Sequence, residues 1–277
     1  MPDNVILVDT SYTTFHRFFA TMRWFSLAEV DIYKEHKDDP TYDWSLEPKF
    51  IEKYTKMYLK SIIDLVSVAV YDNSTLIFCL DSPHDSLWRH ELSDCYKGKR
   101  IDLSAKYNFK PTFKYTYDVL IPKLMSKNIY SIMRPTMEAD DIIALTTRFI
   151  KYKRPNRTIY IVSGDNDFLQ LGYDNLYFVD YKKDTIHLTR EQAKEALRVK
   201  IVTGDCSDNI SSIFPKDEKI SNKIKKLVRE SKEEMKKYLS NNPKSMALYN
   251  HNIKMISFKY IPKHFRRPVY KIINKII

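Results

Sequence analysis

The chain has 277 residues, 43% of them hydrophobic, which suits one large globular domain with a small appendage. Its 46 Lys and Arg against 35 Asp and Glu give a formal charge of +11, which favours a polyanionic partner such as nucleic acid. Three cysteines without a C-x-x-C pair argue against a disulfide framework and a structural zinc site, and the lack of a long apolar run or signal-peptide pattern predicts an intracellular protein that is neither secreted nor membrane-bound.

Three short apolar runs each lead into an acidic residue: Asp9 follows residues 5–8, Asp81 follows residues 76–80, and Asp165 follows residues 159–162. Helical patterns separate the runs, which predicts buried parallel strands in an α/β protein whose mostly parallel central sheet is flanked by helices. Functional groups of such a sheet gather at its carboxyl edge, so we expect the three carboxylates side by side. Any single Asp can simply cap a turn, but three coincidences weaken that interpretation.

The segments around the second strand differ in character. Residues 26–48 are polar and predict a surface insertion, whereas residues 49–71 carry a helical apolar pattern. Residues 82–118 alternate basic and aromatic side chains, and on a continuous helix Arg89, Tyr96 and Arg100 would share a face. Such a face suits phosphates and bases, although a solvated basic surface with core aromatics explains the pattern equally well.

A further strand over residues 129–133 leads to Glu138, Asp140 and Asp141, at the predicted first turn of a helix. The helix dipole tolerates acids there, and a capping role accounts for one of the three. The others raise one another's pKa unless a cation neutralises them. We therefore ask whether other acids of the chain lie near the same place.

The C-terminal part begins near residue 190, where the composition shifts and Thr189 and Gln192 have the spacing of a capping box. The helix that they open is expected to end at Gly204, just before Asp205 and Asp208. The Lys-rich region 216–237 predicts helix, and its charge is either a solvated face or a contact to a duplex backbone. We therefore predict a domain of residues 1–189 and a smaller helical domain of residues 190–277.

Nine carboxylates thus stand at the ends of predicted elements in a basic protein: Asp9, Asp81, Glu138, Asp140, Asp141, Asp165, Asp167, Asp205 and Asp208. Oxygen ligands select Mg²⁺ or Mn²⁺ over zinc. Two such ions can clamp a phosphodiester and activate a water for hydrolysis. No Ser or Cys nucleophile is then required.

Several motifs in one order resemble the flap endonuclease and 5′-3′ exonuclease family, most closely its bacteriophage replication nucleases of the ribonuclease H type. They are Val8-Asp9-Thr-Ser, Leu80-Asp81, Trp88-Arg89-His-Glu, Tyr96-Lys97-Gly-Lys-Arg100, Glu138-Ala-Asp140-Asp141, Ser163-Gly-Asp165-Asn-Asp167-Phe168 with Gln170-Leu171, and Gly204-Asp205-Cys-Ser-Asp208-Asn-Ile. The resemblance spans nearly the whole chain. It implies a PIN-like 5′-nuclease fold with a helical arch insert at about residues 82–120 and a C-terminal domain of helix-hairpin-helix type.

The resemblance also implies roles for the site residues. Asp9, Asp81, Glu138 and Asp140 would hold or approach a first metal, and Asp141, Asp165, Asp167, Asp205 and Asp208 would complete a second site. Lys97 and Arg100 would contact the scissile phosphate, with Arg89 and Tyr96 also on nucleic acid. The glycine-rich turn of most relatives is missing after Ile210, which puts the family's monovalent-ion site in doubt and leaves duplex contact to Lys216, Lys219 and Lys223.

The implied function is a structure-specific 5′-3′ exonuclease and flap endonuclease that uses two Mg²⁺, for which Mn²⁺ can substitute. It would act as a monomer on branched or 5′-ended DNA and on RNA·DNA, and remove primers during viral DNA replication in the host cytoplasm. A single-strand binding protein or a sliding clamp would be its partner.

Three other functions stay open on the sequence. One is a phosphatase with an Asp nucleophile, although the second acid usual two residues later is Ser11 here. Another is a nucleic-acid binding scaffold that lacks turnover. The third is a single-strand ribonuclease of a related small-nuclease fold.

Overall fold

The computed structural model describes residues 2–98, 106–182 and 184–277. Its centre is a five-stranded sheet in the order β3-β2-β1-β4-β5, in which every neighbouring pair is parallel. The strands are β1 (Asn4–Asp9), β2 (Ser74–Leu80), β3 (Ile129–Met133), β4 (Thr158–Val162) and β5 (Leu176–Val179). The predicted parallel α/β sheet is confirmed.

Alternation along the central strand divides the core into two layers. Val5 and Leu7 of β1 pack into one buried cluster, and Ile6 and Val8 pack into the other, because successive side chains of a strand point to opposite faces. Helices α7 and α12 contribute to the first cluster, and α1 and α3 contribute to the second. All four strand residues are fully buried, as expected of a sheet covered on both faces.

The helices of the N-terminal part include those that the sequence predicts over residues 49–71 and from the turn at Glu138. They are α1 (Thr10–Ala28), α2 (Val30–His36), α3 (Pro48–Val66), α4 (Val68–Asp72), α5 (Lys110–Tyr115), α6 (Ile121–Leu124) and α7 (Ala139–Lys153). The polar segment 26–48 holds the end of α1 and all of α2, and its Trp44 is buried among aromatic rings. The segment is therefore more than the surface insertion that the sequence predicts, because Trp44 joins the buried cluster that contains Ile6 and Val8.

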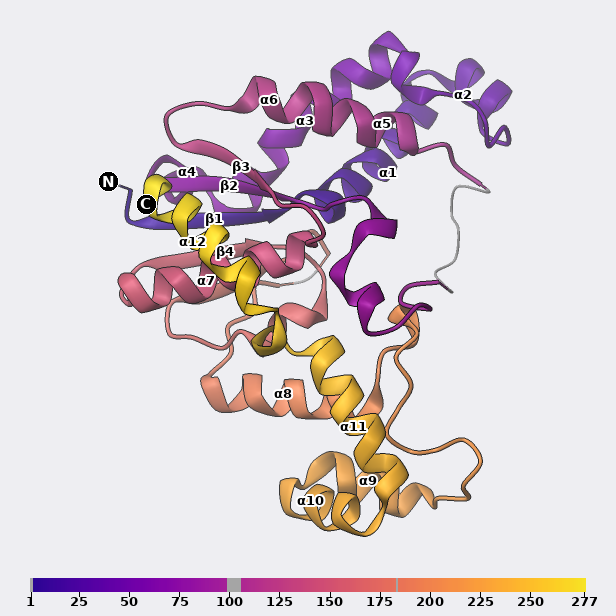
Figure 1. Cartoon of the computed structure of the whole chain (residues 1–277). Helices are drawn as coiled ribbons and strands as arrows, with labels where there is room; N and C mark the ends of the chain where they lie inside the picture. The colour runs from indigo at the N-terminus through magenta and orange to yellow at the C-terminus, as the bar shows by residue number, and fades with distance from the viewer. Residues whose placement is uncertain (1, 99–105, 183) are drawn as a thin grey trace.

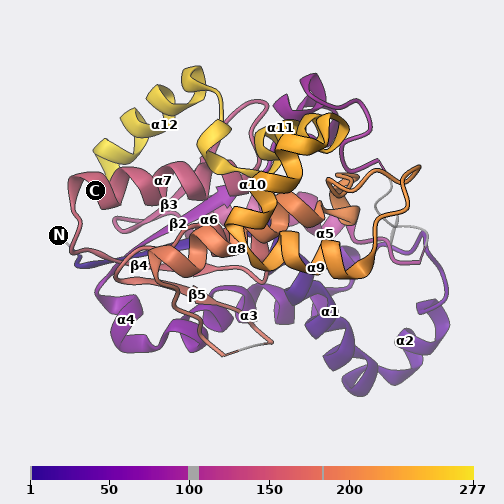
Figure 2. The same ribbon diagram turned by 90° about the horizontal axis from the view of Figure 1, so that it is seen from below.

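The C-terminal part contains α8 (Arg190–Thr203), α9 (Asn222–Glu230), α10 (Lys232–Asn241), α11 (Pro243–Ile256) and α12 (Lys263–Ile276). Thr189 and Gln192 form the predicted capping box, and α8 ends at Gly204 as expected. Helices α9 and α10 lie away from the sheet, whereas α12 lies along α7 (Figure 1). Seen from below, α8 to α11 lie in front of the sheet (Figure 2). Val269 and Ile273 of α12 belong to the same buried cluster as Val5 and Leu7 of β1, so the end of the chain returns to the core around the sheet.

The expected arch insert differs from a continuous helix over its described part. Residues 84–91 form the short 3-10 helices η2 (His84–Ser86) and η3 (Trp88–Glu91), and turns follow as far as Gly98. Arg100 and the rest of residues 99–105 lie outside the described residues. Within the part of the chain that the structure describes, no helix is both long and apolar enough to cross a membrane.

Candidate active site

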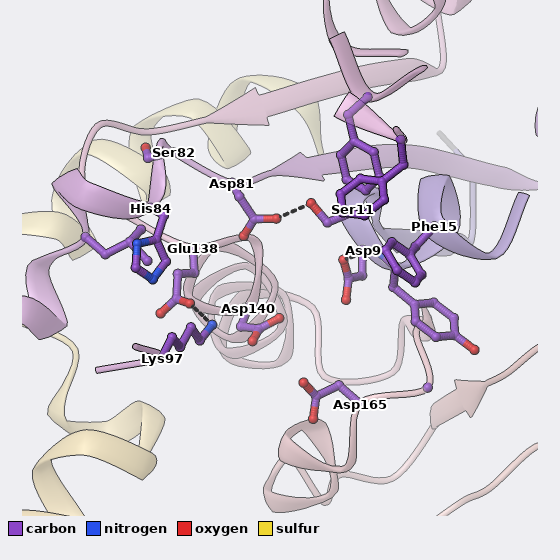
Figure 3. Close-up of a pocket in the computed structure, with 15 residues that line it drawn as sticks. Asp9, Ser11, Phe15, Asp81, Ser82, His84, Lys97, Glu138, Asp140 and Asp165 are labelled. Carbon is purple, nitrogen blue, oxygen red and sulfur yellow. Dashed lines mark hydrogen bonds and ion pairs between the residues drawn. The ribbon is translucent and has the colours of Figure 1, made fainter. Parts of the chain in front are cut away.

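A cavity of about 530 Å³ opens at the carboxyl edge of the sheet, where five carboxylates meet. We call Asp9, Asp81, Glu138, Asp140 and Asp165 the first acidic group, and Figure 3 shows them around one space. Strand order reverses between β1 and β4, and the carboxyl ends at such a switch point form the usual ligand crevice of an open α/β sheet. The expected convergence of Asp9, Asp81 and Asp165 is confirmed.

Hydrogen bonds fix the two strand-end carboxylates. Asp9 caps α1 by accepting from the Tyr12 amide at 3.0 Å, and its other oxygen accepts from Ser163 Oγ at 2.9 Å. Asp81 accepts from the Ala139 amide at 2.7 Å and from the Ser11 hydroxyl. The strand ends and the start of α7 are thereby tied together.

Burial and the crowding of acids raise the pKa values of Asp9 and Asp140 in this group. Burial and the nearby Asp81 raise the pKa of Asp9 to about 7. Burial, Asp165 and Asp9 raise the pKa of Asp140 well above its ordinary value. Burial alone would also raise the pKa of Glu138, but Arg89 and Lys97 lower it to about 2. The group therefore has more negative charge than the protein alone neutralises, which is the condition that a bound cation relieves.

A second acidic group, Asp167, Asp205 and Asp208, lies beside the first. One oxygen of each lies within 4.8 Å of the others, close enough to share an ion. Asp167 belongs to the 3-10 helix η6 (Asn166–Gln170), whereas Asp208 ends η7 (Cys206–Asp208). The loop between Asp205 and Ile210 closes through two backbone hydrogen bonds of 2.8 Å. Gly204 opens it with φ of 71°, where a Cβ would lie 2.4 Å from the Ile210 carbonyl oxygen.

The structure differs from the sequence expectation at three residues. Arg89 is only 4% exposed and pairs with Asp141 at 2.8 Å and with Glu138 at 2.6 Å, so it is not on a nucleic-acid surface. Asp141 is fully buried, and both its oxygens accept from Arg89, with Trp88 Nε1 adding a bond of 2.7 Å. Its carboxylate therefore balances Arg89 instead of joining the second acidic group.

Tyr96 is the third residue whose position differs from the expectation, because it is 4% exposed and its hydroxyl donates to Glu138 at 3.0 Å. Its ring is packed inside the protein and is not presented to a base. Asp141 also accepts from the Glu138 amide at 3.4 Å, which confirms that one acid of this turn has a capping role.

Among the predicted basic residues, Lys97 lies in the cavity wall and its ammonium group pairs with Glu138. It has φ of 58°, uncommon for a residue other than glycine, and its amide donates to the Asp208 carbonyl at 3.3 Å. Lys216, Lys219 and Lys223 are exposed around the start of α9, away from this cavity. Their contact with a duplex stays a prediction.

Sequence reasoning missed Lys200, whose ammonium group pairs with Asp167 and lies 2.9 Å from Asp205. No motif marks it, since it reaches the acids only because α8 packs on η6. Ser11 and Ser163 were also missed as partners of Asp81 and Asp9. The signal that could have found them is their place in the motifs, because Ser11 lies two residues after Asp9 and Ser163 lies two residues before Asp165.

Replacing Asp9 by Asn should stabilise the protein in chelator, increasingly so as the pH rises. The pKa of Asp9 in the folded state, about 7, exceeds its ordinary value of 3.8, so the folded state binds this proton more tightly than the unfolded state does. The free energy of unfolding therefore falls as the pH rises from about 4 to about 7. Asn removes that loss. At pH 8 we expect a melting temperature at least ~3 °C above the parent, and a smaller gain at pH 4.5, by calorimetry. An equal rise in melting temperature at both pH values would contradict the raised pKa of Asp9 in the folded state.

Comparisons with known proteins agree with this geometry. Residues 4–198 match the family model described as 5′-3′ exonuclease, N-terminal resolvase-like domain. A 5′-3′ exonuclease of Buchnera aphidicola subsp. Schizaphis graminum is 29% identical over 153 residues, a stretch that covers 52% of this chain and 49% of that protein. The match thus spans about half the length of that curated relative.

Solved structures share the fold over nearly the whole chain. The T5 D15 protein co-crystallised with metal ions has a TM-score of 0.63 at 17% identity, with 99% of each chain covered. T5 5′-exonuclease with bound zinc gives 0.61 at 18% identity, again with 99% of each chain covered. A variant of the bacteriophage T5 flap endonuclease in a pseudo-enzyme-product complex with DNA and metal ions gives 0.59 at 16% identity, covering 99% of this chain and 98% of that one.

Proposed function

Because this chain belongs to the flap endonuclease and 5′-3′ exonuclease family, we propose that it hydrolyses phosphodiester bonds near the 5′ ends of DNA and RNA·DNA strands with the help of two divalent cations. The observation that carries the proposal is the meeting of the first acidic group in one cavity beside the second acidic group. Removal of RNA primers during viral DNA replication is the biological role that we propose for it.

The donor set fits Mg²⁺ or Mn²⁺. Every candidate ligand in both acidic groups is a carboxylate oxygen, which suits hard cations. The raised pKa values of Asp9 and Asp140 support this assignment, since those carboxylates are short of positive charge without an ion. When bound, the two cations would lower the pKa of an attacking water and neutralise charge on the phosphate.

The residues of the chain would position the substrate. Asp9, Asp81 and Asp140 of the first acidic group, and the three carboxylates of the second, would hold the cations. Lys97 supplies a fixed cation in the cavity wall for the phosphate, as charge in phosphoryl transfer requires. It pairs with Glu138 and so stays close to the acids.

Part of the cavity wall is aromatic and suits an unstacked nucleotide. Phe15, Phe109 and Phe113 line it, with ring centroids of Phe15 5.3 Å from Phe109 and 6.3 Å from Phe113. Aromatic faces accept any base by stacking, so this wall would tolerate different sequences at the cut. Such tolerance agrees with selection by substrate structure.

The test is digestion of 5′-labelled flap, nicked and RNA-primed duplexes with Mg²⁺ and, separately, with chelator. We expect short labelled products from the 5′-ended substrates in Mg²⁺, and none in chelator. An intact single strand without a duplex should be a poor substrate, and its preferred cleavage would favour the single-strand ribonuclease.

Three other outcomes would overturn the proposal. Turnover of a generic phosphomonoester without cleavage of nucleic acid would favour the phosphatase. Binding of flap DNA without any cleavage in Mn²⁺ would favour the binding scaffold. Digestion in chelator equal to that in Mg²⁺ would exclude the role of the cations.

A further inference from the structure

The C-terminal half of α11 is linked, directly or through Arg89, to three of the chain segments that carry the acids. Its Met255 carbonyl accepts from Arg89 Nε at 3.1 Å, and Arg89 pairs with Glu138. Its Ile256 carbonyl accepts from Gln170 Nε2 at 3.1 Å. Asn252, a fully buried residue of the same helix, reaches the third segment. One helix end is therefore shared by elements that are far apart in the sequence.

Gln170 connects the end of α11 to the start of the next helix, because both the nitrogen and the oxygen of its side-chain amide form hydrogen bonds there. Besides its bond to Ile256, its Oε1 accepts from the Phe258 amide at 2.9 Å. The last carbonyls of a helix and the first amides of the next have no partner within their own helices. Gln170 satisfies one of each where α11 gives way to the 3-10 helix η8 (Phe258–Tyr260). Its side-chain position is thus set by two directional bonds.

The same residue belongs to an acid-bearing element. Gln170 ends η6, which Asp165 caps at the other end by accepting from the Asp167 amide at 2.8 Å. Such a short element transmits the position of its last residue to its first ones. Phe168, almost fully buried, packs its ring 6.1 Å from that of Phe258 and reinforces the attachment.

Asn252 attaches α11 to the loop that carries Asp205 and Asp208, the other two acids of the second acidic group. Its Nδ2 donates to the Ile201 carbonyl at 2.9 Å and to the Ser211 carbonyl at 2.8 Å. Those two residues flank the loop that carries Asp205 and Asp208. Hence Asp167 on one side, and Asp205 with Asp208 on the other, are held against a single helix.

We propose that Gln170 and Asn252 are positioning residues, which use α11 as a common support to set the separation between Asp167 and the pair Asp205 and Asp208. This inference rests on the proposed function, because it treats the second acidic group as a cation site. Neither side chain touches the cation in this account. Groups that orient metal ligands typically change metal affinity by about 10–100-fold when they are removed.

The test is Mn²⁺ binding to the substrate-free protein, with free Mn²⁺ measured by electron paramagnetic resonance. The variant is Gln170→Met, which keeps the length of the side chain and removes both hydrogen bonds. We expect one of the two Mn²⁺ to bind about 10-fold more weakly and the other to bind as in the parent. Asn252→Leu, of similar volume, should weaken the same ion.

Gln192→Met is the matched control, since Gln192 also accepts from a backbone amide, that of Thr189 at 2.9 Å, but at the far end of α8. It should leave both affinities unchanged. A lower melting temperature of Gln170→Met with two parental Mn²⁺ affinities would show a merely structural role and overturn the inference. A parental protein that binds fewer than two Mn²⁺ would instead overturn the two-cation assignment, and the inference with it.

Discussion

Asp140→Asn will reduce cleavage of a 5′-flap substrate by about 100- to 1,000-fold, the scale on which a fixed electrostatic group acts at a transition state. Asp140 lies in the cavity wall on the first turn of α7, facing the space that Asp9 and Asp165 share (Figure 3). Asn keeps the shape of the side chain but removes the charge that attracts a cation. Single-turnover cleavage in Mg²⁺ measures the loss.

Binding separates this effect from a loss of structure. The affinity for flap DNA in chelator, measured by fluorescence anisotropy, should change less than about 3-fold, because basic residues supply most of the affinity for phosphates. Asp64→Asn is the matched control, as Asp64 of α3 is exposed and its carboxylate pairs with Lys60 at 2.8 Å, far from the cavity residues. Cleavage by Asp140→Asn at the parental rate would refute the cation assignment.

Arg89→Ala should cause the largest loss of stability, about 3–5 kcal/mol in the free energy of unfolding. Burial alone would lower the pKa of Arg89, but Asp141 and Glu138 raise it well above its ordinary value. Removing the Arg89 guanidinium leaves the carboxylates of Asp141, which is fully buried, and Glu138, which is 3% exposed, without their main positive partner. Urea unfolding in chelator at pH 7 measures the difference.

Two further variants identify the cause of that loss. Lys60→Ala breaks an exposed ion pair and should cost less than about 1 kcal/mol. Adding Asp141→Asn to Arg89→Ala should restore part of the stability, because it removes one of the unpaired charges. If Arg89→Ala costs no more than Lys60→Ala, the buried ion network does not stabilise this fold.

The convergence of acids could be predicted from the sequence because it follows from strand direction. Asp9, Asp81 and Asp165 each end an apolar run, and the carboxyl ends of parallel strands meet at one edge. The capping box at Thr189 and the end of α8 at Gly204 were also predictable, since both depend on neighbouring residues alone.

Tertiary packing decided which charges face the cavity and which face one another. Local pattern placed Arg89 and Tyr96 with the basic residues and Asp141 with the metal ligands. In the structure η3 directs Arg89, and the turns after it direct Tyr96, inward onto the start of α7. Lys200 reaches Asp167 and Asp205 through helix packing, with no trace in their motifs. A sequence pattern states where a side chain leaves the backbone, whereas its partner depends on contacts between segments that only the folded chain brings together.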